Sequence, residues 1–331
     1  MTGPPLTDEQ IKQVEVDAPW LASTCASLLR QHPDDFISYL TTVCTGTAVE
    51  NTRASVHCHL IGCDGNGRPR LNGLARAVAD RIKDYCIPRS EIERAARIHR
   101  EKNSTSEWSR LERKAKELFT HLAQSGEGGE MLLYVLVESM LRIPQLLCKM
   151  PLKTSKHVHY HGVDGIHGTV DKATGVLTLY WGESKLHADI NQAVRDCFKS
   201  VAPFLLESGS SQAAQERDLQ LLRDNLDLND ALLEKAIHRY LDPDDVQFKK
   251  LEFRAACLVG FDSDAYPTVP NTKVEAEVKA EIETVLDAWR GKVKNHVNKQ
   301  KLNTFTIEVF CLPFPKVKDF RASFRKELGI S

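Results

Sequence analysis

The stretch from His157 to Leu206 reads HVHYHGVDGIHGTVDKATGVLTLYWGESKLHADINQAVRDCFKSVAPFLL, and it decides how the chain folds. Two segments within it, Gly165 to Asp171 and Val176 to Lys185, alternate apolar or aromatic residues with polar ones, which predicts two strands. The four residues between them, Lys172 to Gly175, have turn composition and end in glycine. The stretch therefore predicts an antiparallel β-hairpin.

The four-residue turn fixes the register of this hairpin. If Asp171 faces Val176, seven steps back along each strand bring Asp164 opposite Glu183, with Cβ atoms about 4.5–5.5 Å apart. Because side chains alternate between faces, Asp164, Glu183 and Lys185 would share the end of an otherwise apolar face. The opposite face would be polar, with His167, Thr178 and Ser184.

The predicted charge arrangement suits metal-dependent chemistry. Two carboxylates at that distance repel each other unless a proton or a cation joins them, and such oxygen ligands suit Mg²⁺ or Mn²⁺. Lys185 would point the same way and could position or activate a metal-bound water, as hydrolysis of a phosphodiester requires. The alternative is structural: a buried Glu183–Lys185 pair and an Asp164 that only begins a strand.

At these residues the chain resembles known nucleases. The hairpin is similar to the core of the PD-(D/E)xK superfamily, and GVDGIHG followed by LTLYWGESKLH resembles the HamA nuclease family of Hachiman anti-phage defence systems. The resemblance implies a restriction-endonuclease-like core with Asp164 and Glu183 as Mg²⁺ or Mn²⁺ ligands and Lys185 as the catalytic lysine. It also implies a further catalytic acid on the preceding helix, most naturally Glu130. Val163 stands where the superfamily name has proline, at a position that varies widely in such nucleases.

The family resemblance also implies partners. They are DNA as the substrate and a HamB-like helicase subunit that holds the nuclease inactive until DNA is sensed. Two other functions stay open: a restriction or repair endonuclease, and a catalytically silent nuclease fold that serves as a docking subunit. No segment resembles a target-recognition domain, which disfavours the first, and the complete set of Asp164, Glu183 and Lys185 disfavours the second.

Three further residues near the hairpin are weaker candidates for the site. Glu138 lies about 80° round the helix from Glu130, and a partly exposed helix carboxylate is the simpler interpretation. The helix itself, 130–142, is apolar enough to be buried, and we expect it on the hairpin's apolar face. His161 is the last of three alternating histidines, and Gln192 follows Asp189 in a capping-box-like helix start.

The net charge of the 331-residue chain is −1, with 44 Lys and Arg against 45 Asp and Glu. This balance excludes a purely electrostatic nucleic-acid binder, so DNA must be contacted by a local patch. The strongest candidate for contact with the DNA backbone is the acid-free segment 290–301, for which a solvated helix end is the alternative. Its basic residues are Arg290, Lys292, Lys294, Lys299 and Lys301.

The order of elements predicts an α/β fold. Phe253 to Gly260 and Asn303 to Leu312 have the composition of buried strands around a long helix at 271–298, and such crossovers favour parallel neighbours. With the hairpin this gives a mixed sheet flanked by helices. We expect an α-rich N-terminal region, 1–124, whose first 50 residues are mostly helical, followed by a nuclease core, 125–331, with a helical insertion near 210–245.

Cysteine usage and hydropathy indicate the compartment. The nine cysteines are odd in number and include no Cys-x-x-Cys pair, which favours free thiols in a reducing cytosol. The N-terminus lacks a signal-peptide pattern, and no apolar run reaches 18 residues. We therefore expect a cytoplasmic protein with no membrane segment.

Overall fold

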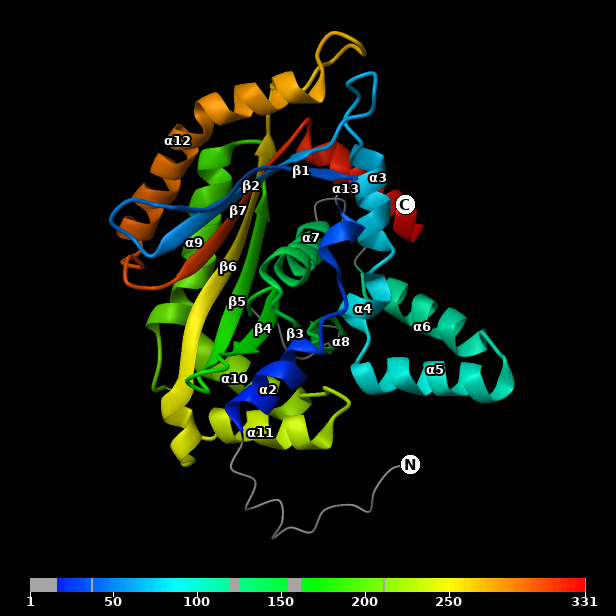
Figure 1. Cartoon of the computed structure of the whole chain (residues 1–331), viewed down its shortest axis with the longest axis vertical. Helices are drawn as coiled ribbons and strands as arrows, with labels where there is room; N and C mark the ends of the chain where they lie inside the picture. Colours follow the sequence, from blue (N-terminus) through cyan, green and yellow to red (C-terminus); the bar gives the residue numbers. More distant parts are fainter. Residues whose placement is uncertain (1–16, 37, 120–125, 154–161, 211, 331) are drawn as a thin grey trace.

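A computed structural model describes residues 17–36, 38–119, 126–153, 162–210 and 212–330. They form an α/β fold around a seven-stranded sheet in the order β1-β2-β7-β6-β5-β4-β3 (Figure 1). The strands are β1 (Leu40–Ala48), β2 (Ala54–Ile61), β3 (Gln145–Leu147), β4 (Gly165–Val170), β5 (Leu177–Leu186), β6 (Leu251–Asp262) and β7 (Ile307–Phe314). Strands β5, β6, β7 and β2 pair in parallel and the others antiparallel, which confirms the predicted mixed sheet.

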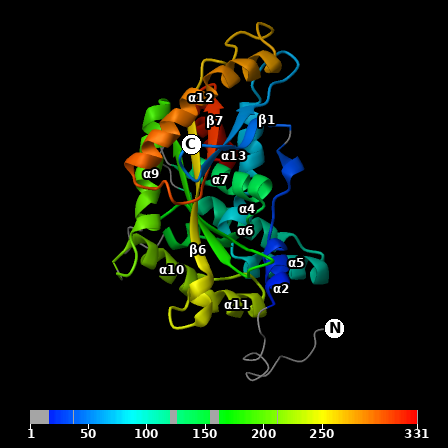
Figure 2. The same cartoon turned by 60° about the vertical axis from the view of Figure 1, so that its left-hand side comes forward.

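Helices cover both faces of the sheet (Figures 1 and 2). Before the hairpin lie α2 (Ala18–Ala26), η1 (Pro33–Asp35), α3 (Leu71–Ala79), α4 (Ile82–Cys86), α5 (Arg89–Lys102), α6 (Ser106–Glu117), α7 (Glu127–Leu136), η2 (Val137–Leu141) and α8 (Met150–Lys153). After it lie α9 (Ile190–Leu206), α10 (Ala214–Asn225), α11 (Ala231–Leu241), η3 (Val246–Lys250), α12 (Glu275–Lys299) and α13 (Val317–Leu328). Helices α10 and α11 fall within the expected insertion near 210–245.

Strands from both sides of residue 124 share the sheet. Strand β2 pairs in parallel with β7, and β1 pairs antiparallel with β2. The expectation that the first 50 residues are mostly helical is wrong at β1, because Leu40–Ala48 is rich in β-branched residues that favour a pleated strand. The region before residue 125 therefore adds two strands as well as helices to the fold.

The β4–β5 hairpin has the predicted register. Gly165 pairs with Gly182 and Val170 with Leu177, and the N–H of Asp171 donates to the oxygen of Val176 at 2.9 Å. The turn between the strands ends at Gly175, whose φ of +69° is a left-handed conformation that glycine adopts readily. The turn composition alone was therefore enough to place the two strands against each other.

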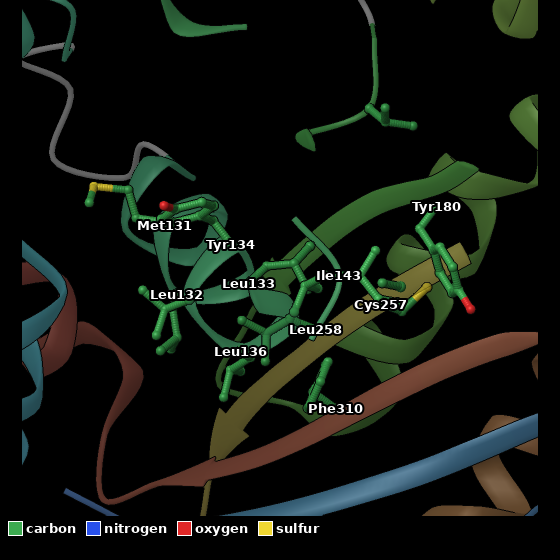
Figure 3. Close-up of a cluster of buried hydrophobic side chains, with 14 of the residues drawn as sticks. Met131, Leu132, Leu133, Tyr134, Leu136, Ile143, Tyr180, Cys257, Leu258 and Phe310 are labelled. Atoms are coloured by element: carbon green, nitrogen blue, oxygen red, sulfur yellow. The ribbon is translucent and has the colours of Figure 1, made fainter. Parts of the chain in front are cut away.

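The apolar helix before the hairpin packs on the face opposite to the predicted one. A Cβ atom on Gly129 of α7 would lie 3.2 Å from Oγ of Ser184, and the rings of Tyr134 and His167 are 6.2 Å apart. The face expected to be polar is thus buried under α7. Figure 3 shows the apolar side chains that α7 presents near the sheet, among them Leu133.

Helix α9 covers the other, apolar face of the hairpin. The ring of Trp181 lies 5.9 Å from that of Phe204. The thiol of Cys197 donates to the main-chain oxygen of Glu183. Because α7 and α9 cover the two faces of the hairpin, β5 is buried at nine of its ten positions.

The cysteines and the hydropathy of the helices can be compared with the sequence expectations. All nine cysteines are free thiols, and six of them are buried. Among the described helices, none has the length and apolar character that a membrane crossing requires.

Candidate functional site

The three residues singled out in the hairpin lie in one pocket. Asp164 directly precedes β4, while Glu183 and Lys185 lie near the end of β5. All three line an open pocket of about 930 Å³. Helices α9 and α10 and their flanking loops supply the other charged residues of its wall, which are His187, Asp196, Lys199, Glu207 and Arg217.

Asp164 lies one step beyond the last regular pair of the hairpin, Gly165 and Gly182. Its N–H donates to the oxygen of Gly182 at 2.8 Å. Its Oδ2 accepts from the N–H of Ser184 at 2.8 Å and from the Oγ of Ser184 at 2.7 Å. The carboxylate is thus held at the strand end by Ser184, a contact that the pleat argument did not foresee.

Glu183 is a buried acid, with only 5% of its side chain exposed. Two effects raise its pKa, to about 8: first burial, because the ionised form is poorly solvated, and second the charge of Asp164. The ammonium group of Lys185 contacts Oε1 of Glu183 and opposes both effects without cancelling them. The positive charge of Lys185 therefore does not fully compensate the two carboxyl groups.

Lys185 is held in its charged form. Burial lowers the pKa of Lys185, but Glu183 and then Asp164 outweigh burial, and the net shift is upward. A lysine with a raised pKa stays protonated near neutral pH and cannot accept a proton from water. Of the two roles predicted for Lys185, the raised pKa favours positioning a water or stabilising negative charge over deprotonating the water.

The two acids fit a hard divalent cation. Mg²⁺ is commonly bound through one or two carboxylates and keeps several waters, which matches a donor set of Asp164 and Glu183. Within the described ranges, no group of three or more His, Cys, Asp or Glu side chains could hold a metal ion.

Glu130 lies beside the pocket without lining it. It is half-buried in the first turn of α7, and its charge contributes to the raised pKa of Glu183. Its Oε2 lies 3.2 Å from the hydroxyl of Tyr85, which also lies 3.3 Å from the main-chain oxygen of Asp164. Tyr85, from α4, thus links Glu130 to the hairpin, and nothing in the sequence pattern indicated it.

Two of the three weaker candidates, Glu138 and Gln192, do not line the pocket. Glu138 is fully buried, not partly exposed, and it accepts from the N–H groups of Arg30 and Gln145, both at 2.9 Å. Burial raises the pKa of this carboxyl, and its two N–H donors belong to the loop after α2 and to β3. Gln192 is exposed and does not line the pocket; its N–H donates to Asp189 at 2.8 Å, which confirms the predicted helix cap. His161 lies outside the described residues.

The basic segment 290–301 lies at the end of α12 and just after it, and none of its residues lines the pocket. Three of its cations bind elsewhere on the protein. Arg290 pairs with Asp287 at 2.8 Å, Lys292 bonds to Asn191 at 2.6 Å and Lys294 pairs with Glu50 at 2.8 Å. The two remaining basic residues of the segment are Lys299, the last residue of α12, and Lys301, just after it.

Two cations of the pocket were not predicted. Lys199 projects from α9, and Arg217 from α10. A signal for the first was present in the sequence. Asp196, Lys199, Ser200 and Pro203 have the spacing i, i+3, i+4 and i+7 and so form a stripe beside the apolar face of α9.

The fold and the site together define an α/β protein in which two carboxylates and a lysine, at one end of the β4–β5 hairpin, line an open pocket. A sequence model of the HamA family matches residues 34–328 of the 331. The chain therefore belongs to the HamA family of Hachiman defence systems. The match includes both the strands before residue 124 and the hairpin. A search among curated proteins found no significant match.

Proposed function

We propose that this chain is the nuclease subunit of a Hachiman defence complex and hydrolyses DNA phosphodiester bonds with Mg²⁺ or Mn²⁺. One observation carries the proposal: the buried carboxyl group of Glu183 lines the same open pocket as Asp164, and burial and Asp164 raise its pKa to about 8. Burying two acids together is unfavourable unless a cation compensates them. Family membership supports the defence role.

The side chains have distinct tasks in this proposal. Asp164 and Glu183 would hold the metal ion, which when bound lowers the pKa of water and neutralises charge on the scissile phosphate. Lys185, as an ammonium group, would orient the attacking water and stabilise charge that develops on the phosphate oxygens. Glu130 would assist from α7 by adding negative potential beside the metal ligands.

The pocket cations would guide the DNA backbone. Lys199 and Arg217 are exposed on the pocket wall and form no ion pair with the described residues. Phosphate contacts position a nucleic acid without reading its sequence, which suits a nuclease with little sequence preference. The segment 290–301 on α12 is proposed as a second backbone contact, more distant from the site.

Two other functions are separated from this one by simple measurements. A restriction or repair endonuclease would cut DNA without a helicase partner, whereas a defence subunit should co-purify with the helicase. A catalytically silent docking subunit would bind the helicase but not cleave. The proposed helicase partner follows from the family and has no separate support from the pocket.

The test is cleavage of supercoiled and linear DNA by the purified chain with Mg²⁺, Mn²⁺ or EDTA, alone and with the helicase subunit and DNA ends. A Glu183→Ala, Lys185→Ala variant should lose all metal-dependent cleavage. The matched control is Glu252→Ala, Arg254→Ala, which removes an ion pair of the same spacing from the neighbouring strand β6, outside the pocket. No cleavage in either setting, together with no Mn²⁺ binding, would overturn the proposal.

A further inference from the structure

A buried ion pair joins the segment after β3 to helix α10. Nζ of Lys149 lies 2.9 Å from Oδ2 of Asp218, and the two side chains are 4% and 2% exposed. The residues are 69 positions apart in the sequence. Apolar residues of similar volume often stabilise a protein as well as or better than a buried ion pair does. Stability alone is therefore a weak explanation for this pair.

The pair binds both polar main-chain groups of one residue, Val163. Nζ of Lys149 donates to the oxygen of Val163 at 2.6 Å. Oδ2 of Asp218 accepts from the N–H of Val163 at 3.2 Å. Strand β4 begins only at Gly165, so at Val163 the ion pair takes the place that a neighbouring strand would have in a sheet.

The chain passes close to the pair at the preceding residue. A Cβ atom on Gly162 would contact Nζ of Lys149 and lie 2.8 Å from Oδ1 of Asp218. A larger residue at Gly162 would therefore push the main chain away from the pair. The same ion pair thus packs closely against Gly162 and makes two hydrogen bonds to Val163, which together hold the Val163 peptide in place.

The next residue along the chain is Asp164, the proposed metal ligand. Its carboxylate must lie near Glu183 while bonded to Ser184. Because the peptide between Val163 and Asp164 is planar, a displacement of Val163 is passed directly to Asp164. Groups that orient a metal ligand commonly affect metal affinity 10-fold to 100-fold.

We propose that Lys149 and Asp218 are positioning residues that fix the main chain of Asp164 for metal binding, which rests on the proposed function. They act through Val163, and neither lines the pocket. Helix α10 thereby contributes twice to the site, because Arg217 lines the pocket and the adjacent Asp218 holds the hairpin. Helix α10 would thus couple contact with the substrate, through Arg217, to the geometry of the metal site, through Asp218.

The test is the variant Lys149→Met, Asp218→Leu, which leaves no unpaired buried charge. We expect Mn²⁺ affinity lowered at least about tenfold, together with a lower free energy of unfolding, because the N–H and the oxygen of Val163 lose their partners. The charge-swapped variant Lys149→Asp, Asp218→Lys restores an ion pair but reverses the groups facing Val163, and it should not restore Mn²⁺ affinity. The control is Arg239→Met, Asp245→Leu, which removes a 2.9 Å ion pair that does not touch the hairpin.

Each outcome has one meaning. Wild-type Mn²⁺ affinity in a folded Lys149→Met, Asp218→Leu variant would overturn the positioning role while leaving the proposed function intact. If that variant does not fold, Gly162→Ala displaces the chain from the pair without removing a charge, and unchanged Mn²⁺ affinity there would equally overturn the role. No Mn²⁺ binding by the wild type would overturn the proposed function and this inference with it.

Discussion

The hydroxyl group of Tyr85 lies 3.2 Å from Oε2 of Glu130, which joins helix α4 to helix α7 beside the hairpin. Tyr85 is fully buried, so this hydroxyl has no access to water as a substitute partner. The region before residue 124 therefore contributes to the surroundings of the site through a side chain as well as through strands of the sheet.

The first prediction concerns this link. Tyr85→Phe should lower the free energy of unfolding by about 1 kcal/mol, the typical net contribution of one hydrogen bond. It should also slow DNA cleavage, because Glu130 would lose a hydrogen-bond donor that helps to orient it. The effect of adding Glu130→Gln to Tyr85→Phe should be smaller than its effect in the wild type. Cleavage and urea unfolding measure both expectations.

A matched control separates the link from the general cost of removing a hydroxyl. Tyr240→Phe removes a hydroxyl that donates to the main-chain oxygen of Gly175 at 2.7 Å, at the turn end of the hairpin. If Tyr85→Phe and Tyr240→Phe cleave DNA equally fast, the hydrogen bond between Tyr85 and Glu130 has no part in cleavage.

A second prediction concerns the metal. Adding Mn²⁺ at about 100 times its dissociation constant should raise the free energy of unfolding by about 2.7 kcal/mol, because the ion binds the folded state only. Glu183→Gln should abolish this increase, since it removes one of the two carboxylates. Glu252→Gln on β6 should retain it. Thermal unfolding with Mn²⁺ or EDTA measures the difference, and an undiminished Mn²⁺ effect in Glu183→Gln would exclude Glu183 as a ligand.

The hairpin could be predicted from the sequence because its determinants are local. A four-residue turn and the two-residue period of a strand fix the register between Gly165 and Gly182. The parallel pairing of β6 and β7 was likewise predictable, because long helical crossovers favour parallel neighbours. The cap that Asp189 provides for α9 depends on residues three positions apart.

Contacts between distant segments were not predictable in this way. Helix α7 could cover either face of the hairpin, because the polar face can be buried once its groups are bonded, as Nδ1 of His167 is to the oxygen of Ile143 at 3.1 Å. The pair of Lys149 and Asp218 has no periodic signal, since its partners come from different elements. The burial of Glu138 has the same origin: its two N–H donors belong to segments that pack against it.

A third prediction concerns pH and His167. Burial lowers the pKa of this histidine from 6.5 to about 4. Between these values the unfolded chain binds a proton that the folded protein does not, so the free energy of unfolding falls as the pH falls from 6.5 to 4. The expected loss from His167 is about 3 kcal/mol. His167→Asn, which can keep a donor near the oxygen of Ile143, should remove that part of the pH dependence.

Two comparisons define the result for His167. His59, whose pKa burial likewise lowers to about 4, should leave a residual slope in the variant. His238→Asn, at an exposed position on α11, should leave the wild-type slope unchanged. Urea unfolding at a series of pH values measures all three proteins, and equal slopes in the wild type and His167→Asn would contradict the prediction.

The last prediction separates the two candidate DNA surfaces. Lys199→Gln, Arg217→Gln should weaken DNA binding and reduce the slope of log K against log salt by about 1.8, because each phosphate contact contributes about 0.9. The comparison variant is Lys299→Gln, Lys301→Gln at the end of the basic segment, which removes the same charge away from the pocket. Binding is measured in EDTA, so that cleavage does not interfere, and Mn²⁺ affinity should be close to wild type in both variants. A larger loss of slope in the Lys299, Lys301 variant would place the main DNA contact on α12, because counterion release reports where phosphates are neutralised and not where they are cut.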